Sequence, residues 1–183
     1  ALKELLHREL TQNNPDGDGL FCARMPYWAP ENDSYGPKTG LQSAQMLRAL
    51  RGAAEMAQVA GDPEAGRIYA AYALKIERAL PQLWDSKAGV LGWRDPLDVL
   101  QISPSSDDVF FPILRGAVTP IQGYQMIRWV RENLWSEVYP GTARIWLTAN
   151  SGPKQGLGPL PDVSWSTVAA AALAGDVDSF YPV

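Results

Sequence analysis

Hydrophobic residues recur at intervals of three and four positions along most of the chain, which is the period of an amphipathic helix. The first example is the set Leu2, Leu5, Leu6 and Leu10, and the longest patterns lie between residues 41 and 84. The spacing predicts helices over 2–11, 41–60, 63–84, from 109 onward, over 120–135 and over 166–174. We therefore expect an all-α fold.

The two longest predicted helices are separated by Gly61, Asp62 and Pro63. Glycine commonly follows the last turn of a helix, aspartate caps the first turn of the next, and proline is favoured at the first helical position. Helices joined by so short a turn pack antiparallel, as an αα-hairpin. The alanines of the first helix should let the two backbones approach closely.

Three connections are long and rich in Gly, Pro, aromatic and acidic residues: 13–36, 85–108 and 136–162. The second contains short apolar pieces around Val90 and Trp93, so it is expected to form a small β-hairpin. It ends in Ser105-Ser106-Asp107-Asp108, which can cap a helix starting at Val109. Long connections of this kind are more often functional than idle.

Composition narrows the classes of function. The chain has 183 residues with a net charge of −4, which suits one soluble globular domain over 1–183. It lacks runs of Lys and Arg, so nucleic acid and anionic membranes are not expected as partners. No apolar run approaches the roughly 18 residues of a membrane span, and no signal-peptide pattern is present. The sequence assigns no compartment.

The single cysteine, Cys22, excludes an intramolecular disulfide, and the single histidine, His7, lies on the first predicted helix. A lone histidine is more often structural than a metal ligand or catalytic base. Chemistry of the Ser/His/Asp type is therefore not expected.

Asn14, Asp16 and Asp18 place oxygen-bearing side chains at alternate positions, and Gly19 follows them. This spacing resembles the opening of a calcium-binding EF-hand loop, in which the carbonyl of Leu20 would be a further ligand. The residue at the twelfth position is methionine rather than glutamate, so such a Ca²⁺ site would need a ligand from elsewhere. The alternative is a plain Asp-Gly turn.

The stretch from Tyr27 to Gly36 combines Trp28 and Tyr35 with the carboxylates of Glu31 and Asp33. Aromatic faces stack on the CH groups of sugar rings, while carboxylates accept hydroxyl protons or deliver protons to a leaving oxygen. The segment is therefore a candidate carbohydrate site. The alternative is that its aromatic residues cover a helical core and its acids are solvated.

A weak internal repeat accompanies these loops. Ala60-Gly61-Asp62 recurs as Ala174-Gly175-Asp176, and Leu83-Trp84 recurs as Leu134-Trp135. Each unit has one tight and one long, polar connection, which is the asymmetry of an α/α toroid. With its Asp-Gly-Asp-Gly-Leu, Glu-Asn-Asp-Ser-Tyr and Ser-Asp-Asp motifs, the chain resembles the six-hairpin (α/α)6 glycosidases. The nearest family is the bacterial β-glucosidases related to non-lysosomal glucosylceramidases.

This resemblance implies a glycoside hydrolase that acts on a glucoside or a similar neutral carbohydrate. The general acid would be Asp108 or Asp107, and in an alternative alignment Asp33. Glu31 would bind hydroxyls or serve as the opposing carboxylate. The aromatic side chains expected to line the subsites are Trp28, Tyr35, Trp93 and Trp146.

In the resembled family, the Asp-Gly-Asp-Gly-Leu stretch belongs to a calcium loop, so Asn14, Asp16, Asp18 and Leu20 are the expected ligands here. A complete toroid has six hairpins and we count about three, so we interpret the chain as a fragment, with the rest of the ring as a partner. The alternative is a non-catalytic helical module that binds carbohydrate.

Overall fold

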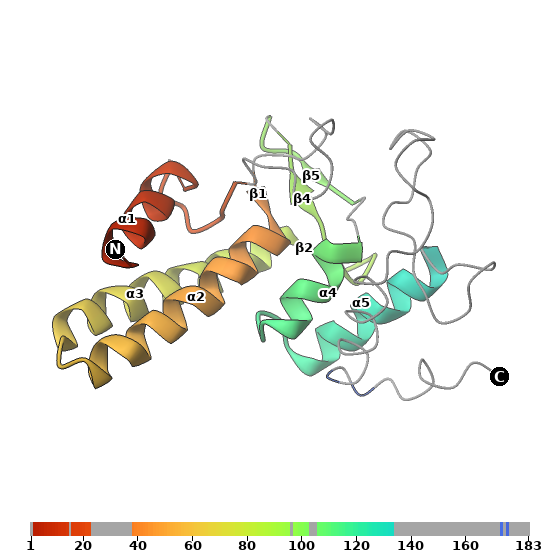
Figure 1. The fold of residues 1–183 in the computed structure, drawn as a ribbon. Coiled ribbons are helices and arrows are strands. Elements are labelled where there is room, and N and C mark those ends of the chain that lie inside the picture. Colours follow the sequence, from red (N-terminus) through yellow and green to blue (C-terminus); the bar gives the residue numbers. More distant parts are fainter. Residues whose placement is uncertain are drawn as a thin grey trace, which may run out of the picture.

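A computed structural model describes the chain over residues 2–14, 16–22, 38–95, 97–102 and 106–133, together with residues 173 and 175. Five helices and one 3-10 turn form most of this part, and five short strands accompany them (Figure 1). The helices are α1 Leu2–Gln12, α2 Gly40–Val59, α3 Pro63–Ala79, α4 Ser106–Leu114 and α5 Pro120–Asn133, and the 3-10 turn is Leu80–Leu83. The described part of the chain is thus mainly helical.

The predicted αα-hairpin is confirmed as α2 and α3, which lie side by side and antiparallel (Figure 1). Gly61 adopts a left-handed φ of 74°, and the Asp62 carboxylate accepts a hydrogen bond from Ala65 N at 3.1 Å. The helices approach closely because small residues face each other: a Cβ placed on Gly66 would lie 3.3 Å from Ala54 O. The tight turn and the alanines therefore act as the sequence predicts.

The helix expected to begin at Val109 begins earlier, at Ser106, so Asp107 and Asp108 belong to its first turn rather than to a preceding cap. Carboxylates in a first turn interact favourably with the partial positive charge of the helix N-terminus, which is consistent with this earlier start. Helix α4 packs against α2 and α5, and it places Val109 and Phe110 in the core with no exposed surface.

The prediction of an all-α fold needs one correction, because the long connection forms antiparallel strands as well as turns. β2 Trp84–Asp85 pairs with β3 Val90–Leu91, and β4 Trp93–Arg94 pairs with β5 Leu100–Gln101. β1 Lys38–Thr39 joins β4 and completes a three-stranded sheet in the order β1-β4-β5. The small hairpin expected in this region is therefore confirmed, with a second hairpin and an added strand that the sequence did not predict.

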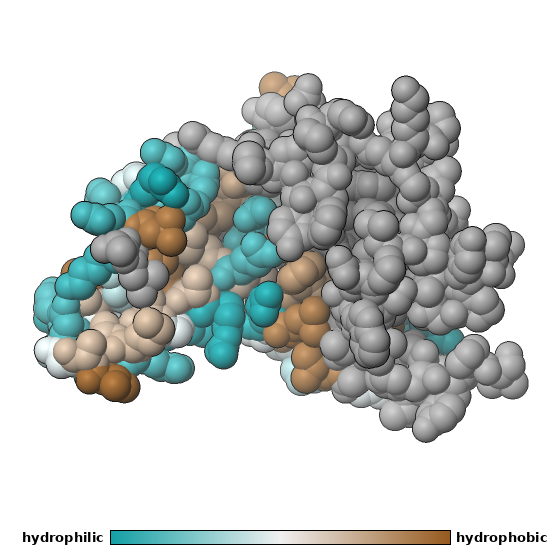
Figure 2. Space-filling view, viewed as in Figure 1, coloured by the Kyte–Doolittle hydropathy of each residue, from teal (hydrophilic) through white to brown (hydrophobic). Residues whose placement is uncertain are grey.

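The face shown in Figure 2 is mainly hydrophilic over α1, α2 and α3, with separate hydrophobic patches between the polar side chains. Within the described helices and turns, no helix combines the length and apolar character needed to cross a membrane. The last predicted helix and the second half of the internal repeat lie outside the described residues, apart from Leu173 and Gly175.

Candidate functional site at the start of helix α2

The loop of residues 13–22 is attached to the beginning of α2 by backbone and hydroxyl hydrogen bonds. Thr39 N donates to Phe21 O at 3.1 Å, and Phe21 N donates to Ser43 Oγ at 3.0 Å. Thr39 also caps α2, because its Oγ1 accepts from Gln42 N at 3.2 Å. The residues on either side of segment 23–37 are thereby held together at one end of α2, which we call the loop end.

The loop end also includes the first turn of α4 and strand β3. A Cβ placed on Gly40 would lie 3.2 Å from Leu91 Cδ1 and 3.8 Å from Asp108 O. Asp108 itself is only 1% exposed, although it is a carboxylate. Of the predicted catalytic residues, Asp108 is thus the one whose side chain is described, and it is buried beside the start of α2.

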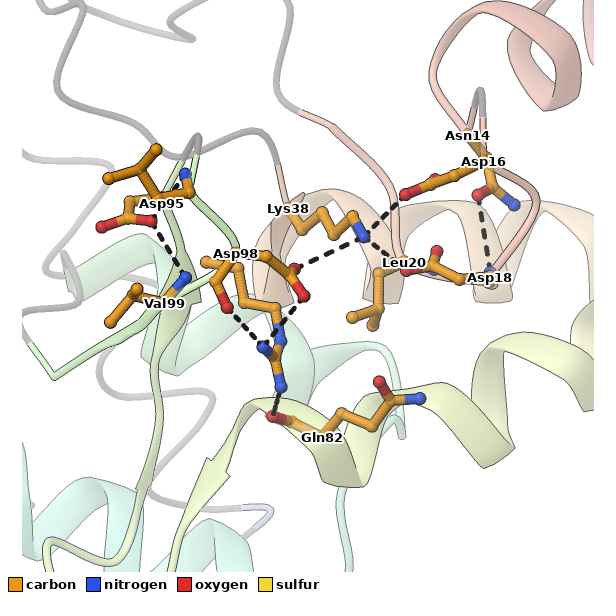
Figure 3. Close-up of polar contacts among 12 residues, drawn as sticks. Asn14, Asp16, Asp18, Leu20, Lys38, Gln82, Asp95, Asp98 and Val99 are labelled. Atoms are coloured by element: carbon orange, nitrogen blue, oxygen red, sulfur yellow. Dashed lines mark hydrogen bonds and ion pairs between the residues drawn. The ribbon is translucent and has the colours of Figure 1, made fainter.

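Lys38, in β1, joins the loop to the neighbouring hairpin through three carboxylates (Figure 3). Its Nζ lies 2.8 Å from Asp16 Oδ2, 2.6 Å from Asp18 Oδ2 and 3.6 Å from Asp98 Oδ1. The Lys38 side chain is 12% exposed and that of Asp18 is 29% exposed, so water screens this pair less than an ordinary surface ion pair. Asp16 and Asp98 are more than half exposed. Two segments far apart in sequence therefore share one cation.

The charges of this cluster affect one another. Burial lowers the pKa of Lys38, but its hydrogen bonds to Asp16 and Asp18 and their negative charges outweigh burial, so the pKa lies above its usual value. The hydrogen bond from Lys38 holds the pKa of the Asp16 carboxyl below its usual range. Around neutral pH, Lys38 is thus a cation and Asp16 an anion.

The β4–β5 hairpin is braced by a second cation. Arg94 donates from Nη1 to Asp98 O at 2.6 Å and from Nη2 to Gln82 O at 3.3 Å, and the same Nη1 lies 3.4 Å from Asp98 Oδ2. Asp98 has a φ of 61°, a left-handed conformation that aspartate tolerates better than most residues. Backbone hydrogen bonds from Val99 and Leu97, with a side-chain bond from Gln101, lower the pKa of Asp95.

Oxygens of the predicted calcium ligands have partners within the protein. Asn14 Oδ1 accepts from Gly19 N at 3.4 Å, and Asp18 Oδ1 accepts from Leu20 N at 2.8 Å. Asp16 Oδ2 and Asp18 Oδ2 both contact Lys38 Nζ. Over the described residues, no group of three or more His, Cys, Asp or Glu side chains is placed to hold a metal ion. Calcium binding stays a prediction, and it would compete with Lys38.

The predicted sugar-binding and catalytic residues are only partly described. Trp93 lies in β4, half-buried, opposite Thr39 of β1 and Gln101 of β5. Asp107 lies in the first turn of α4, and its side chain is outside the described part. The remaining predicted site residues lie outside the described residues, namely Trp28, Glu31, Asp33, Tyr35 and Trp146.

Sequence reasoning missed Lys38, Arg94 and Asp98. No motif marks Lys38, because its carboxylate partners come from two separate segments, the loop before β1 and the β4–β5 hairpin. Arg94 and Asp98 lie four residues apart within one hairpin. One signal was available: Lys38 is one of two cations, with Arg24, between the acidic residues of the loop and the long predicted helix.

No protein-family model matches the chain, and a search of curated proteins finds no matching relative. The case for a function therefore depends on the residues and geometry of the loop end.

Proposed function

We propose that the chain contributes to the catalytic domain of a six-hairpin glycoside hydrolase, with Asp108 as the general acid. The substrate class is a glucoside or a similar neutral carbohydrate. The observation that carries the proposal is the 1% exposure of Asp108, a carboxylic acid in the first turn of α4 beside the start of α2. Hydrolysis of a glycoside needs a carboxyl group that delivers a proton to the leaving oxygen.

Asp108 combines two features that suit the proposed role. Its side chain is withdrawn from water, as a carboxyl group in a closed catalytic site is. It also stands in the first turn of α4, where a helix N-terminus interacts favourably with carboxylates.

The αα-hairpin of α2 and α3 is the structural unit of the proposed toroid, and the remaining hairpins of the ring are its proposed partners. Among the described residues, Trp93 is the aromatic side chain proposed to stack on the sugar ring. It is half-buried in strand β4, next to Arg94. In this proposal Glu31 binds substrate hydroxyls or serves as the carboxylate opposite Asp108. Trp28, Tyr35 and Trp146 are further subsite residues.

A second candidate function is a non-catalytic helical module that binds carbohydrate. The observation in its favour is that Lys38 contacts all three carboxylates nearest to it, Asp16, Asp18 and Asp98. These three carboxylates are therefore part of an ion cluster. Under this alternative the loop end binds sugar without turnover.

Turnover of a panel of aryl glycosides by the full chain tests the proposal. The wild type should hydrolyse at least one member, and Asp108→Asn should reduce the rate by about 10²-fold or more, since general acids contribute 10²–10⁴-fold. The matched control is Glu55→Gln, on the exposed side of α2, which should keep the rate. Asp33→Asn examines the alternative alignment. Sugar binding without turnover by the wild type would favour the module.

A further inference from the structure

Lys38 is surrounded by carboxylates, the side chains that commonly bind a calcium ion. Its ammonium group has three N–H donors, and three carboxylates surround it at 2.6, 2.8 and 3.6 Å. Two of the three acids, Asp16 and Asp18, are those whose spacing predicts calcium binding. The third, Asp98, comes from the tip of the β4–β5 hairpin.

We propose that Lys38 is the structural cation of the Asn14–Leu20 loop, so that the loop folds without Ca²⁺. The chain supplies from β1 the positive charge that the sequence pattern would otherwise assign to a metal ion. Because Lys38 directly precedes Thr39, the cap of α2, the same residue connects the acidic loop, the hairpin tip and the start of the long helix.

The oxygen atoms of the loop favour lysine over calcium. Calcium takes 6–8 oxygen ligands at 2.3–2.6 Å. Here Asn14 Oδ1 accepts from Gly19 N and Asp18 Oδ1 accepts from Leu20 N, while Asp16 Oδ2 and Asp18 Oδ2 contact the Lys38 ammonium. Four of the five side-chain oxygens of Asn14, Asp16 and Asp18 thus already have partners in the protein. A calcium ion would need to displace Lys38 from two of them.

The local charge balance also favours Lys38 as the cation that stabilises the loop. The three carboxylates face two cations, Lys38 and Arg94, which leaves one net negative charge. Without Lys38, Asp16 and Asp18 would repel each other at close range and would lose the cation that contacts both of them. Removal of Lys38 should therefore loosen the attachment of the loop to α2, while removal of metal from the wild type should change nothing.

Thermal melts of the full chain test the proposal, with each protein first stripped by EDTA and then measured with EDTA or with millimolar CaCl₂. The wild type should melt at the same temperature in both, and a calorimetric titration with CaCl₂ should show no binding. Lys38→Met, which keeps the length of the side chain and removes the charge, should melt several degrees lower. The matched control is Lys87→Met, an exposed lysine in the turn between β2 and β3, which should melt like the wild type.

Two results would overturn the proposal. One is a wild-type Tm that falls in EDTA and is restored by CaCl₂, which would assign the loop to calcium. The other is a Lys38→Met variant that melts with Lys87→Met. If Lys38→Met does not fold, Lys38→Arg tests the proposal instead. Because arginine keeps the positive charge, this variant should melt close to the wild type and at the same temperature with EDTA as with CaCl₂. These readouts require no catalysis, so they are independent of the proposed hydrolase.

Discussion

Gly19 lies directly against the backbone of Lys75: a Cβ on Gly19 would come within 2.9 Å of Lys75 O. Gly19 also has a φ of 96°, which L-residues with a side chain rarely adopt. The acidic loop therefore rests on α3 at a point where only glycine fits. This contact sets how far Asp16 and Asp18 stand from the α2–α3 hairpin.

Gly19→Ala is expected to destabilise the fold by about 2–4 kcal/mol, the sum of left-handed strain and overpacking against a fixed carbonyl. Urea unfolding measures the loss. Gly52→Ala is the control, because an added Cβ there meets no atom within 4 Å and Gly52 lies within α2. That change should stabilise by about 0.5–1 kcal/mol. Equal effects at both sites would contradict the close approach to Lys75.

The Thr39 hydroxyl caps α2 from a fully buried position. Thr39→Val preserves the shape but leaves Gln42 N without its acceptor, so a loss of about 0.5–2 kcal/mol is expected. Thr39→Ser keeps the hydroxyl and should lose less. The two free energies of unfolding, compared under the same conditions, measure the contribution of the cap. A larger loss in the serine variant would show that the methyl group, not the cap, matters.

Ala57 on α2 packs in the core at the interface with α3, near Gly66. Ala57→Leu should force the two helices apart and cost about 1–3 kcal/mol. Glu55→Leu places the same leucine side chain on the exposed side of this helix, so it should stay within about 0.5 kcal/mol of the wild type. Chemical denaturation of both variants checks this pair. If Ala57→Leu left the free energy of unfolding unchanged, α2 and α3 would not be closely packed at this position.

Asp95 should titrate below the value of a free aspartate, since backbone hydrogen bonds from Val99 and Leu97 and a side-chain bond from Gln101 lower its pKa. A carboxyl with a depressed pKa in the folded state stabilises above its unfolded pKa of about 3.9. That contribution is lost as pH falls from there through the lower folded pKa. NMR titration of the Asp95 side chain follows this directly. Gln101→Met should raise the pKa partway, and a titration at the ordinary value would contradict the network.

The helical part of the fold was largely predictable, and the site was not. Gly61, Asp62 and Pro63 act locally, so the start of α3 could be predicted from sequence. The beginning of α4 was placed three residues too late, because a run of Ser and Asp serves equally as a cap or as a first turn. The Lys38 cluster depends on the pairing of β1 with β4, across more than fifty residues, and no local pattern encodes such a pairing.

Two features of the site show why it could not be predicted from the sequence. The Asn14-Asp16-Asp18 spacing is compatible with a metal ion or with a turn, and the choice depends on which cation the fold brings to it. The burial of Asp108 likewise depends on the contact between Gly40, Leu91 and the first turn of α4, which joins three separate segments.

The most direct test of the proposed hydrolase is the dependence of the Asp108→Asn defect on the leaving group. A general acid matters when the departing oxygen needs a proton and matters little when it departs readily as an anion. We predict that Asp108→Asn loses about 10²-fold or more in kcat/KM on a phenyl glycoside but keeps most of its kcat/KM on a dinitrophenyl glycoside of the same sugar. Equal losses on the two substrates, or no turnover of either by the wild type, would contradict Asp108 as the general acid.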